Sequence, residues 1–388
     1  MRIVIGGFLL ERNQDEQYMA YALKLAERGL GWTNPNPMVG AVIVAAGEVI
    51  GVGYHPRLGE GHAERQALAD TVAKGHREQL AGATMYVTLE PCCHQGRTPP
   101  CTQAIIEAGI ARVVVGALDS NVLVAGKGIQ QLKEAGLTVD TGVFAKESRQ
   151  LNRTFFHFNE TGLPFVVMKY AMTLDGKIAA HTGHSQWVTG PVARQHVHRS
   201  RHAFQAIMVG VGTVIADDPL LNVRLEELSE PCHPIRVVCD SHLRTPLESR
   251  LVQSAKELPL IIATTVTNQA QQATYEAYGC QILTLPADDA GQVDLRSLMK
   301  ELAKQGIISV YLEGGAQLNW SALKAGLVQE VHTYIAPKLV GGQDAPSAIS
   351  GLGFGRMDEA LGLRIRQIER LGEDIWIESE VTGCLQES

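Results

Sequence analysis

The feature that most constrains this chain is a set of metal-binding side chains that occur in a fixed order. His62 is followed two residues later by Glu64, and Pro91 directly precedes Cys92, with Cys101 further along. Zinc binds imidazole nitrogen and thiolate sulfur, and three protein ligands leave a fourth position where water can be held. A histidine, a non-ligand glutamate and a proline-cysteine pair in this order are typical of zinc deaminases. The sequence therefore predicts a zinc site with a glutamate as proton carrier.

The spacing of the two cysteines differs from the usual signature, in which two residues separate them. Here eight residues stand between Cys92 and Cys101. Thr98 followed by two prolines predicts a helix start, so Cys101 is expected in a first helical turn, where the helix dipole favours a thiolate. Cys93 and His94 remain alternative ligands, and Cys92 is preferred because it directly follows the proline.

Length and composition favour a two-domain protein that acts on small molecules. The 388 residues exceed the size at which one hydrophobic core stops growing. With 34 Lys+Arg against 41 Asp+Glu, the net charge of −7 disfavours a general nucleic-acid surface but permits local phosphate pockets. The apolar stretches are far shorter than the roughly 20 residues of a membrane span, and residues 1–10 do not form a convincing secretory signal. Seven cysteines, an odd number, favour a reducing cytoplasm over a disulfide framework.

Helices that alternate with short apolar strands predict an α/β sheet covered on both faces in the first part of the chain. Regular order is expected to weaken over 146–164, and a boundary there gives domains 1–162 and 163–388. The aromatic residues 155–158 are interpreted as a docking or core segment. Helices are expected at 15–30, from His62, at 100–108 and at 126–135, and strands at 39–45, 83–89, 112–117 and 137–143.

Five motifs of the first part match the pattern of one enzyme family. They are Thr33-Asn34-Pro35-Asn36-Pro37, Val39-Gly40-Ala41-Val42, Gly61-His62-Ala63-Glu64, Thr88-Leu89-Glu90-Pro91-Cys92 and Gly96-Arg97-Thr98-Pro99-Pro100-Cys101. In these the chain resembles the bifunctional riboflavin-biosynthesis deaminase-reductases, and the last loop is the specific part. The resemblance implies a cytidine-deaminase-like three-layer sandwich in which His62, Cys92 and Cys101 hold Zn²⁺. It also implies that Glu64 shuttles protons while water replaces a ring amine of 2,5-diamino-6-(ribosylamino)pyrimidinone 5'-phosphate as ammonia.

Glycines at strand ends mark the second part of the chain. A strand is expected at 165–172, and another at 206–213 that runs into a glycine turn. Ile215 stands where a dinucleotide fingerprint needs a third glycine, so an ordinary Rossmann site is disfavoured. A strand from Ile308 ends in paired glycines and opens a helix at 317–324, where an anion could approach the amides. The same glycines could equally form a tight turn without any ligand.

The second part resembles the reductase half of the same family. Shared segments are Ser185-Gln186-Trp187, Arg194, Tyr334-Ile335-Ala336-Pro337-Lys338-Leu339 and Gly341-Gly342. The resemblance implies a dihydrofolate-reductase-like α/β domain in which NADPH reduces the ribosyl chain to ribityl. The residues expected to border NADPH are Ala171, Trp187, Thr213, Asp217, Gly315, Ala316, Gln317, Leu318, Asn319, Trp320 and Ser321. Those expected to border the substrate are Ser185, Arg201, Leu221, Arg224 and Glu313.

Two arginines of this set, Arg201 and Arg224, have the chemistry of phosphate clamps. Lys169 is the candidate for polarising the ribosyl carbon that receives hydride. The chain departs from the family at Asp119-Ser120-Asn121-Val122, where Asp-Pro-Asn-Pro is usual, and at 71–79, which is longer than usual. Neither change touches a predicted zinc ligand.

Two other classes remain open from the sequence alone. A nucleic-acid base deaminase would share the zinc motif, but it should also carry a basic or aromatic stripe. A nucleotide-binding regulatory protein could keep the second domain without turnover. The expected partner is a phosphoribosylated pyrimidine, without nucleic acid or membrane, and the expected assembly is a homo-oligomer, a dimer or a tetramer.

Overall fold

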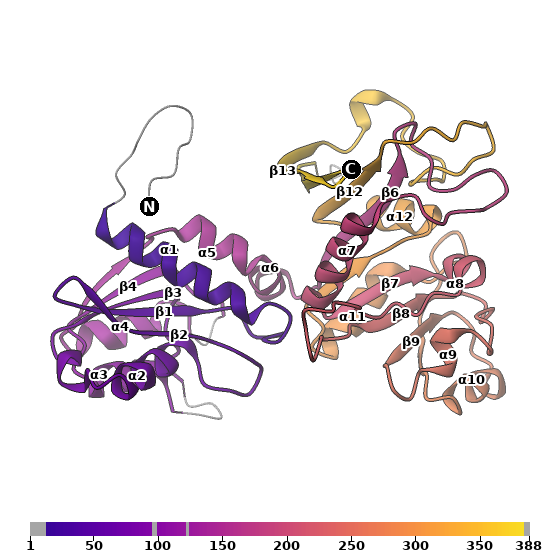
Figure 1. Cartoon of the computed structure of the whole chain (residues 1–388). Coiled ribbons are helices and arrows are strands. Elements are labelled where there is room, and N and C mark those ends of the chain that lie inside the picture. The colour runs from indigo at the N-terminus through magenta and orange to yellow at the C-terminus, as the bar shows by residue number, and fades with distance from the viewer. Residues whose placement is uncertain (1–12, 95–98, 122–123, 384–388) are drawn as a thin grey trace. The chain divides into compact units, whose positions relative to one another are not determined.

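The computed structural model describes residues 13–94, 99–121 and 124–383. Contacts divide the chain into two compact units, Met1–Thr161 and Gly162–Ser388 (Figure 1). Four residues of the long cysteine loop, Gln95, Gly96, Arg97 and Thr98, lie outside the described residues, as do Val122 and the segment 1–12.

Unit 1 is an alternation of helices and strands. Its elements are α1 (Gln14–Ala26), β1 (Gly40–Ala45), β2 (Glu48–Tyr54), α2 (Ala63–Ala73), β3 (Thr84–Leu89), α3 (Cys101–Glu107), β4 (Arg112–Ala117), α4 (Lys127–Glu134), β5 (Thr138–Thr141), α5 (Ala145–Leu151) and α6 (Arg153–Thr161). The strands form one sheet in the order β2-β1-β3-β4-β5. β1 pairs antiparallel with β2 and β3, whereas β3, β4 and β5 run parallel.

Alternate residues of these strands point into two separate cores, because successive side chains of a strand face opposite sides of its sheet. Met19 of α1 packs with Val42 on one face. Ile105 of α3 and Leu132 of α4 pack with Ile43 on the other face, which α2 also covers. Unit 1 is therefore the three-layer α/β sandwich that was predicted (Figure 1).

The strand β2 is absent from the sequence-based prediction, because glycines interrupt its apolar pattern. A Cβ atom on Gly53 would lie 2.3 Å from the carbonyl oxygen of Ala63, and one on Gly51 would lie 2.6 Å from that of Ala67. Both oxygens belong to α2, so the missing side chains let this helix lie directly against the strand. The glycines that hide β2 in the sequence thus place the helix that carries Glu64.

The segment 146–164 is mostly helical, which corrects the expectation of weak order there. It contains most of α5 and all of α6, and the ion pair of Arg149 with Glu160, at 2.5 Å, joins the two helices. Phe156 is 3% exposed and packs with Leu89 and Ala117. The aromatic run that disguised this helix therefore supplies core contacts, as expected for a core segment.

Unit 2 is built on a longer sheet. Its elements are β6 (Phe165–Thr173), α7 (Pro191–Ala203), β7 (Ala206–Gly210), α8 (Val211–Asp217), β8 (Ile235–Cys239), α9 (Arg250–Gln253), β9 (Leu260–Thr264), α10 (Gln269–Glu276), β10 (Gln281–Thr284), α11 (Leu295–Lys304), β11 (Ser309–Leu312), α12 (Ala316–Lys324), β12 (Glu330–Ala336), β13 (Leu363–Leu371) and β14 (Asp374–Val381). The strand order is β10-β9-β8-β7-β11-β6-β12-β14-β13. The seven strands from β10 to β12 in this order run parallel, and β14 and β13 add an antiparallel hairpin.

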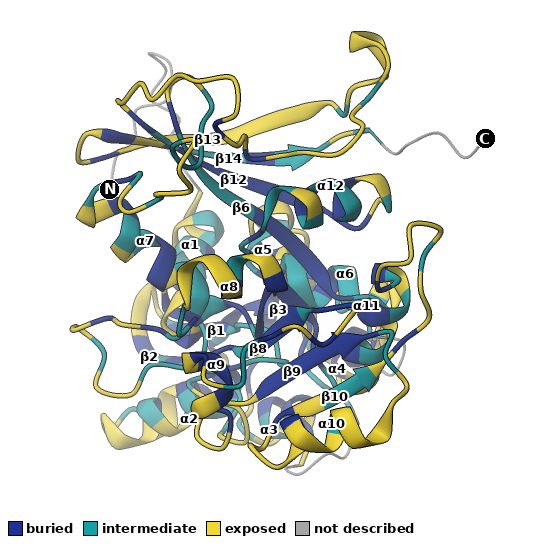
Figure 2. Cartoon of the chain, turned by 90° about the vertical axis from the view of Figure 1, so that its right-hand side faces the viewer, coloured by how far each residue is buried: buried dark blue, intermediate teal, exposed yellow. Residues whose placement is uncertain are grey.

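Helices cover both faces of this sheet. Leu298 of α11 packs with Val310 on one face, and Val197 of α7 packs with Tyr334 on the other. Figure 2 shows β8, β9 and the first half of β6 as mostly buried and β13 as mostly exposed. The central strands are thus buried on both faces, which suits their near-continuous apolar sequences.

Replacing Gly53 with alanine should destabilise unit 1 by about 1–3 kcal/mol, because the new Cβ would overlap backbone atoms of α2. Calorimetry of the zinc-loaded chain should show a lower unfolding temperature for unit 1. The matched control is Gly212→Ala, since a Cβ there has nothing within 4 Å. Equal stability of Gly53→Ala and the unchanged chain would contradict the close contact of α2 with β2.

Candidate functional site

Three side chains from three separate segments meet in unit 1. His62 is the N-cap of α2, Cys92 follows β3, and Cys101 is the first residue of α3. The Nδ1 atom of His62 lies 3.6 Å from the sulfur of Cys92 and 3.4 Å from that of Cys101. The three ligand atoms all lie within 4.8 Å of one another. The structure therefore brings together all three residues predicted to bind zinc.

The two sulfur ligands are held by the start of α3. Cys101 occupies the first turn, as predicted, and Pro100 is the N-cap of the helix. The backbone N–H of Cys101 donates to the sulfur of Cys92 at 3.4 Å. Hydrogen bonds from Cys101 and His62 lower the pKa of Cys92 to about 4, against the effect of burial. A thiolate is the form that binds metal, so this donor set fits Zn²⁺.

The alternative ligands to Cys92 are Cys93 and His94. Among the described residues, the cluster around His62 contains Cys92 and neither of these neighbours. The pKa of Cys93 is raised, mainly by burial, which disfavours its thiolate form. The residue directly after the proline is thus the one that the fold turns towards the site.

Glu64 lies in the first turn of α2, two residues after the histidine ligand, and is 3% exposed. Burial, followed by the negative charge of Cys92, raises its pKa to about 6. A carboxyl group with a pKa near neutrality can both accept and donate a proton. This position next to the cluster suits the proton carrier that the motif predicts.

Glu90 also supports the site, although its role was missed in the sequence. This carboxylate is 4% exposed and accepts hydrogen bonds from four backbone N–H groups. The donors are Asp119 at 3.2 Å, Gly126 at 2.9 Å, Gly128 at 3.0 Å and Ile129 at 3.2 Å. They tie the start of α4 to the end of β3, immediately before the proline-cysteine pair. The only sequence signal was the glutamate inside the Thr-Leu-Glu-Pro-Cys motif.

A second set of residues missed in the sequence lies beside the histidine ligand. The ring of His55 stands 5.4 Å from the ring of His62, at an angle of 77°. Its Nδ1 lies 3.2 Å from the carbonyl oxygen of Gly61, and its Nε2 lies 3.3 Å from the amide nitrogen of Asn36. The segment that contains Asn36 therefore reaches the neighbourhood of the metal ligands.

Unit 2 contains a buried ionic cluster around Glu313. The carboxylate accepts two hydrogen bonds from Arg201, from Nε at 2.6 Å and Nη2 at 2.9 Å. Lys169 lies 3.5 Å from the same carboxylate. Burial would raise the pKa of Glu313, but the charges of Arg201 and Lys169 outweigh it and lower this pKa to about 2. Three predicted site residues thus meet at one point, and the glutamate among them is anionic.

The second predicted phosphate clamp has a different environment. Arg224 is exposed, and its Nη2 lies 3.3 Å from Nε2 of His198. By contrast, Arg201 also donates to the carbonyl oxygen of Asn222 at 3.1 Å, so its guanidinium is already occupied on two sides. Leu221 is buried and has a positive φ of 53° in the segment before Arg224.

Several of the residues predicted to border NADPH lie near one another. Asp217 accepts a hydrogen bond at 3.1 Å from the hydroxyl of Ser185, a residue predicted to border the substrate. A Cβ on Gly315 would lie 3.6 Å from the hydroxyl oxygen of Thr213, so α8 and the start of α12 adjoin. Gly315 is the N-cap of α12, and no side chain in the described part of the chain caps that helix start. The first turn of α12 is thus suited to meet an anionic group.

Other residues of this set face different surroundings. Asn319 is 2% exposed and donates to the carbonyl oxygen of Ala348 at 2.9 Å, and Trp320 stacks edge-on against Phe354. Trp187 is 59% exposed. Ala316, Gln317, Leu318 and Ser321 belong to the same helix as Asn319, and Ala171 lies on β6.

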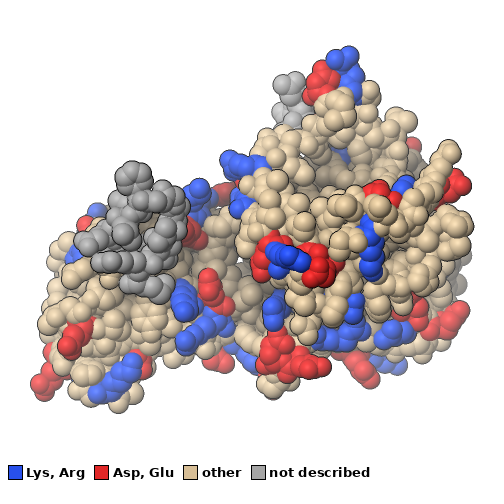
Figure 3. Space-filling view, turned by 45° about the horizontal axis from the view of Figure 1, so that its top comes forward, with Lys and Arg blue, Asp and Glu red and all other residues tan. Residues whose placement is uncertain are grey.

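Lysine, arginine, aspartate and glutamate are intermixed on the face shown in Figure 3. No broad region of one sign covers the described part of that face. Among the described residues, no helix is both long and apolar enough to cross a membrane.

Two family models match this chain. The RibD C-terminal domain matches residues 164–377, and the cytidine and deoxycytidylate deaminase zinc-binding region matches residues 12–117. The two matches fall on the two halves that the sequence had distinguished. The zinc-binding region contains His62, Glu64, Cys92 and Cys101.

Similar proteins extend the match to almost the whole chain. The riboflavin biosynthesis protein RibD of Actinobacillus pleuropneumoniae is 49% identical over 96% of both chains. The structure of Acinetobacter baumannii RibD, form 1, is 38% identical with a TM-score of 0.85, covering 95% of this chain and 99% of that one. A diaminohydroxyphosphoribosylaminopyrimidine deaminase/5-amino-6-(5-phosphoribosylamino)uracil reductase of Thermotoga maritima is 34% identical with a TM-score of 0.84 and the same coverage.

These matches cover both units, and unit 1 carries the complete zinc-ligand set. The chain belongs to the RibD family of bifunctional riboflavin-biosynthesis deaminase-reductases.

Proposed function

We propose that this chain deaminates 2,5-diamino-6-(ribosylamino)pyrimidinone 5'-phosphate and then reduces the ribosyl chain of the product to ribityl with NADPH. The observation that carries the proposal is the presence, in one chain, of two separate buried clusters of charged or metal-binding groups. One is the His-Cys-Cys group beside Glu64, and the other joins Lys169, Arg201 and Glu313. The name of the Thermotoga maritima relative covers both reactions.

The deamination step exchanges an amine for an oxygen. Zinc held by the three ligands would lower the pKa of a water molecule to about 7 and so supply a nucleophile at neutral pH. Glu64 takes the proton that the attacking water loses and delivers it to the ring amine. The carbon–nitrogen bond then breaks and ammonia leaves. The second proton of the water ends on the adjacent ring nitrogen, so the ring carbon keeps the oxygen as a carbonyl group. A carboxyl pKa of about 6 suits both halves of this transfer.

In the reductase unit, NADPH would supply hydride to the ribosyl carbon, whose bond to the ring oxygen breaks, and that oxygen would take up a proton. Lys169 polarises that carbon, and the anionic Glu313 holds the ammonium group in place. We assign NADPH contacts to Ala171, Trp187, Thr213, Asp217 and the first turns of α12 from Gly315 to Ser321. The glycine N-cap of that helix, which no described side chain caps, and the proximity of Thr213 support this assignment.

The substrate is assigned to Ser185, Arg201, Leu221, Arg224 and Glu313. Arg224 is the stronger candidate to meet the phosphate, because this residue is exposed and its guanidinium contacts the ring of His198 rather than a carboxylate. Arg201 is held by Glu313 and a backbone carbonyl, so it also orients that glutamate.

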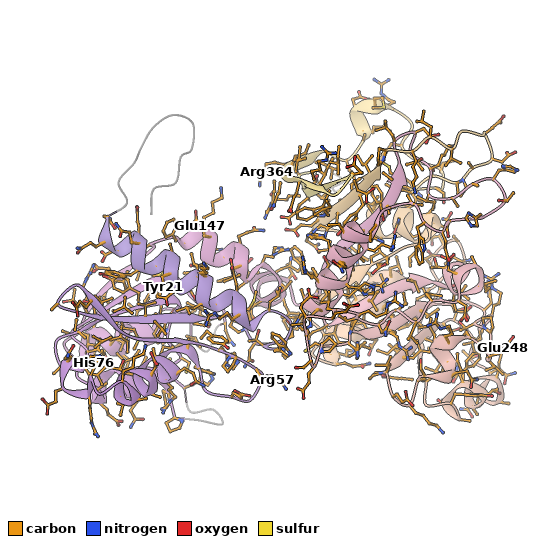
Figure 4. The ribbon with its side chains drawn as sticks, in the orientation of Figure 1. Tyr21, Arg57, His76, Glu147, Glu248 and Arg364 are labelled. Atoms are coloured by element: carbon orange, nitrogen blue, oxygen red, sulfur yellow. The ribbon has the colours of Figure 1, made fainter. Side chains whose placement is uncertain are left out.

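We also propose that the enzyme is a cytoplasmic homo-oligomer, a dimer or a tetramer. The edge strand β13 supports an assembly, since Ile365 and Ile368 are 56% and 62% exposed. Figure 4 marks Arg364 on the same strand. Exposed apolar edge strands are sites where chains associate. Light scattering of the purified chain tests this part of the proposal.

Glu64→Gln should lower the rate of ammonia release about 10²–10⁴-fold, because the amide cannot carry the proton. Zinc bound per chain and NADPH oxidation with the deaminated substrate should stay unchanged. Ammonia release at the rate of the unchanged enzyme would contradict the assigned proton carrier.

Arg224→Ala should raise the KM of the reductase for the phosphorylated substrate at least tenfold and change the KM for NADPH little, since a charge-assisted phosphate contact is lost. Arg199→Ala is the matched control, because Arg199 forms an exposed ion pair with Glu227. An equal rise of both KM values would contradict the assignment of Arg224 to the substrate.

Glu313→Gln should abolish reduction and destabilise unit 2 by about 3–5 kcal/mol, because two buried cations lose their counter-charge. Deamination should continue. In the unchanged chain the folded-state pKa of about 2 lies below the ordinary 4.5, so this stabilisation is present above pH 4.5 and is lost as the pH falls towards 2. Glu373→Gln, at an exposed ion pair, is the control. Normal reduction by Glu313→Gln would refute the role of this cluster.

A further inference from the structure

We infer that Asn152 is a positioning residue for the deaminase reaction. It lies between α5 and α6 and is 2% exposed. Its side-chain oxygen accepts the backbone N–H of Met38 at 2.7 Å, and its side-chain nitrogen donates to the carbonyl oxygen of Met38 at 2.8 Å. One amide thus satisfies both polar backbone groups of a residue that is 114 positions away in the chain.

Met38 belongs to a short segment, residues 36–40, that connects the last helices of unit 1 to the zinc ligands. Asn36 contacts the ring of His55 at 3.3 Å, and that ring lies 5.4 Å from the ring of His62. The backbone N–H of His55 also donates to the carbonyl oxygen of Val39 at 2.9 Å. A shift of this segment would therefore move the groups that border the metal ligands.

The clamp is rigid because the backbone of Asn152 is fixed by both neighbouring helices. Its N–H donates to Ser148 of α5 at 3.3 Å, and its carbonyl oxygen accepts from Phe156 of α6 at 3.0 Å. α5 in turn lies close to β4, where a Cβ on Gly116 would stand 2.4 Å from the hydroxyl of Ser148. In Figure 4, Glu147 marks this helix. The side-chain amide therefore reaches Met38 from a base that cannot readily move.

A second anchor holds the same segment from the sheet. The hydroxyl of Thr88, which is fully buried, accepts the backbone N–H of Gly40 at 3.2 Å. Asn152 and Thr88 act on residues two positions apart, and neither belongs to the predicted zinc or proton-transfer groups. Their common target is the position of the 36–40 segment.

Misplacement of catalytic surroundings by about 1 Å can cost about 10²-fold in rate. Asn152→Ala in the full chain should lower kcat/KM for ammonia release at least tenfold, mainly through kcat. Zinc bound per chain and the reductase kinetics with deaminated substrate should stay within twofold. Hydrogen exchange of the amides at 36–40 should become faster. Thr88→Val, which removes only a hydroxyl, should change deamination in the same direction and by less.

Glu160→Gln is the control, because it removes the surface ion pair between α5 and α6 without touching the 36–40 segment. It should leave both reactions unchanged. Unchanged deamination kinetics in both Asn152→Ala and Thr88→Val would overturn the inference. So would an equal loss of zinc, deamination and reduction in Thr88→Val, which would indicate a general role in folding. Each variant is compared with the unchanged enzyme on the same pyrimidine, so an incorrect substrate would show first as inactivity of the unchanged enzyme.

Discussion

Contact between backbone atoms of β2 and α2 sets the geometry of the deaminase centre. A side chain at residue 51 or 53 would occupy space that α2 now fills. The helix begins directly after His62 and carries Glu64 in its first turn, so its distance from the sheet decides where both groups lie. Backbone atoms cannot rotate away as side chains do, so a larger residue at position 51 or 53 would push α2 away from β2. The position of His62, one of the predicted metal ligands, is therefore fixed by this distance between α2 and β2.

Other supports of the same centre also act on the backbone. Glu90 binds four N–H groups at the start of α4 and in the loop before it. Asn152 binds both polar groups of Met38. In each case a buried side chain replaces the secondary-structure partner that an irregular segment lacks, and a buried backbone group without a partner would be costly. Met38 and the segment before α4 are therefore held by side-chain hydrogen bonds where strand pairing is absent.

The reductase unit relies on charge instead. Lys169 comes from β6, Arg201 from α7 and Glu313 from the end of β11, so the cluster joins three elements. Buried ions stabilise a fold poorly unless each has a counter-charge. Removing one ion leaves its partner as a buried charge without compensation, which is strongly destabilising. The benefit of the arrangement is a fixed ammonium group beside an anionic carboxylate. The parallel strands, buried on both faces, supply a rigid frame for it.

The sequence predicted the features that depend on residues close together in the chain. The zinc ligands and Glu64 follow from a short ordered motif, and most strands of unit 1 follow from apolar runs. It failed where a local pattern and the tertiary context disagree. Two glycines interrupt the apolar pattern of β2 because α2 fills the space beside them, and α6 was obscured by aromatic residues, of which Phe156 packs on Leu89. The pairing of Arg201 with Glu313 joins residues 112 positions apart. No local sequence pattern indicates that these two residues form an ion pair.

The position of Asn152 bears on how the two activities can be separated in the laboratory. The last sheet strand of unit 1, β5, ends at Thr141, and a fragment designed around the sheet alone would stop there. Such a fragment would omit the clamp on Met38 and the Phe156 ring beneath Leu89. An isolated deaminase should therefore extend through Thr161, and an isolated reductase can begin at the next residue.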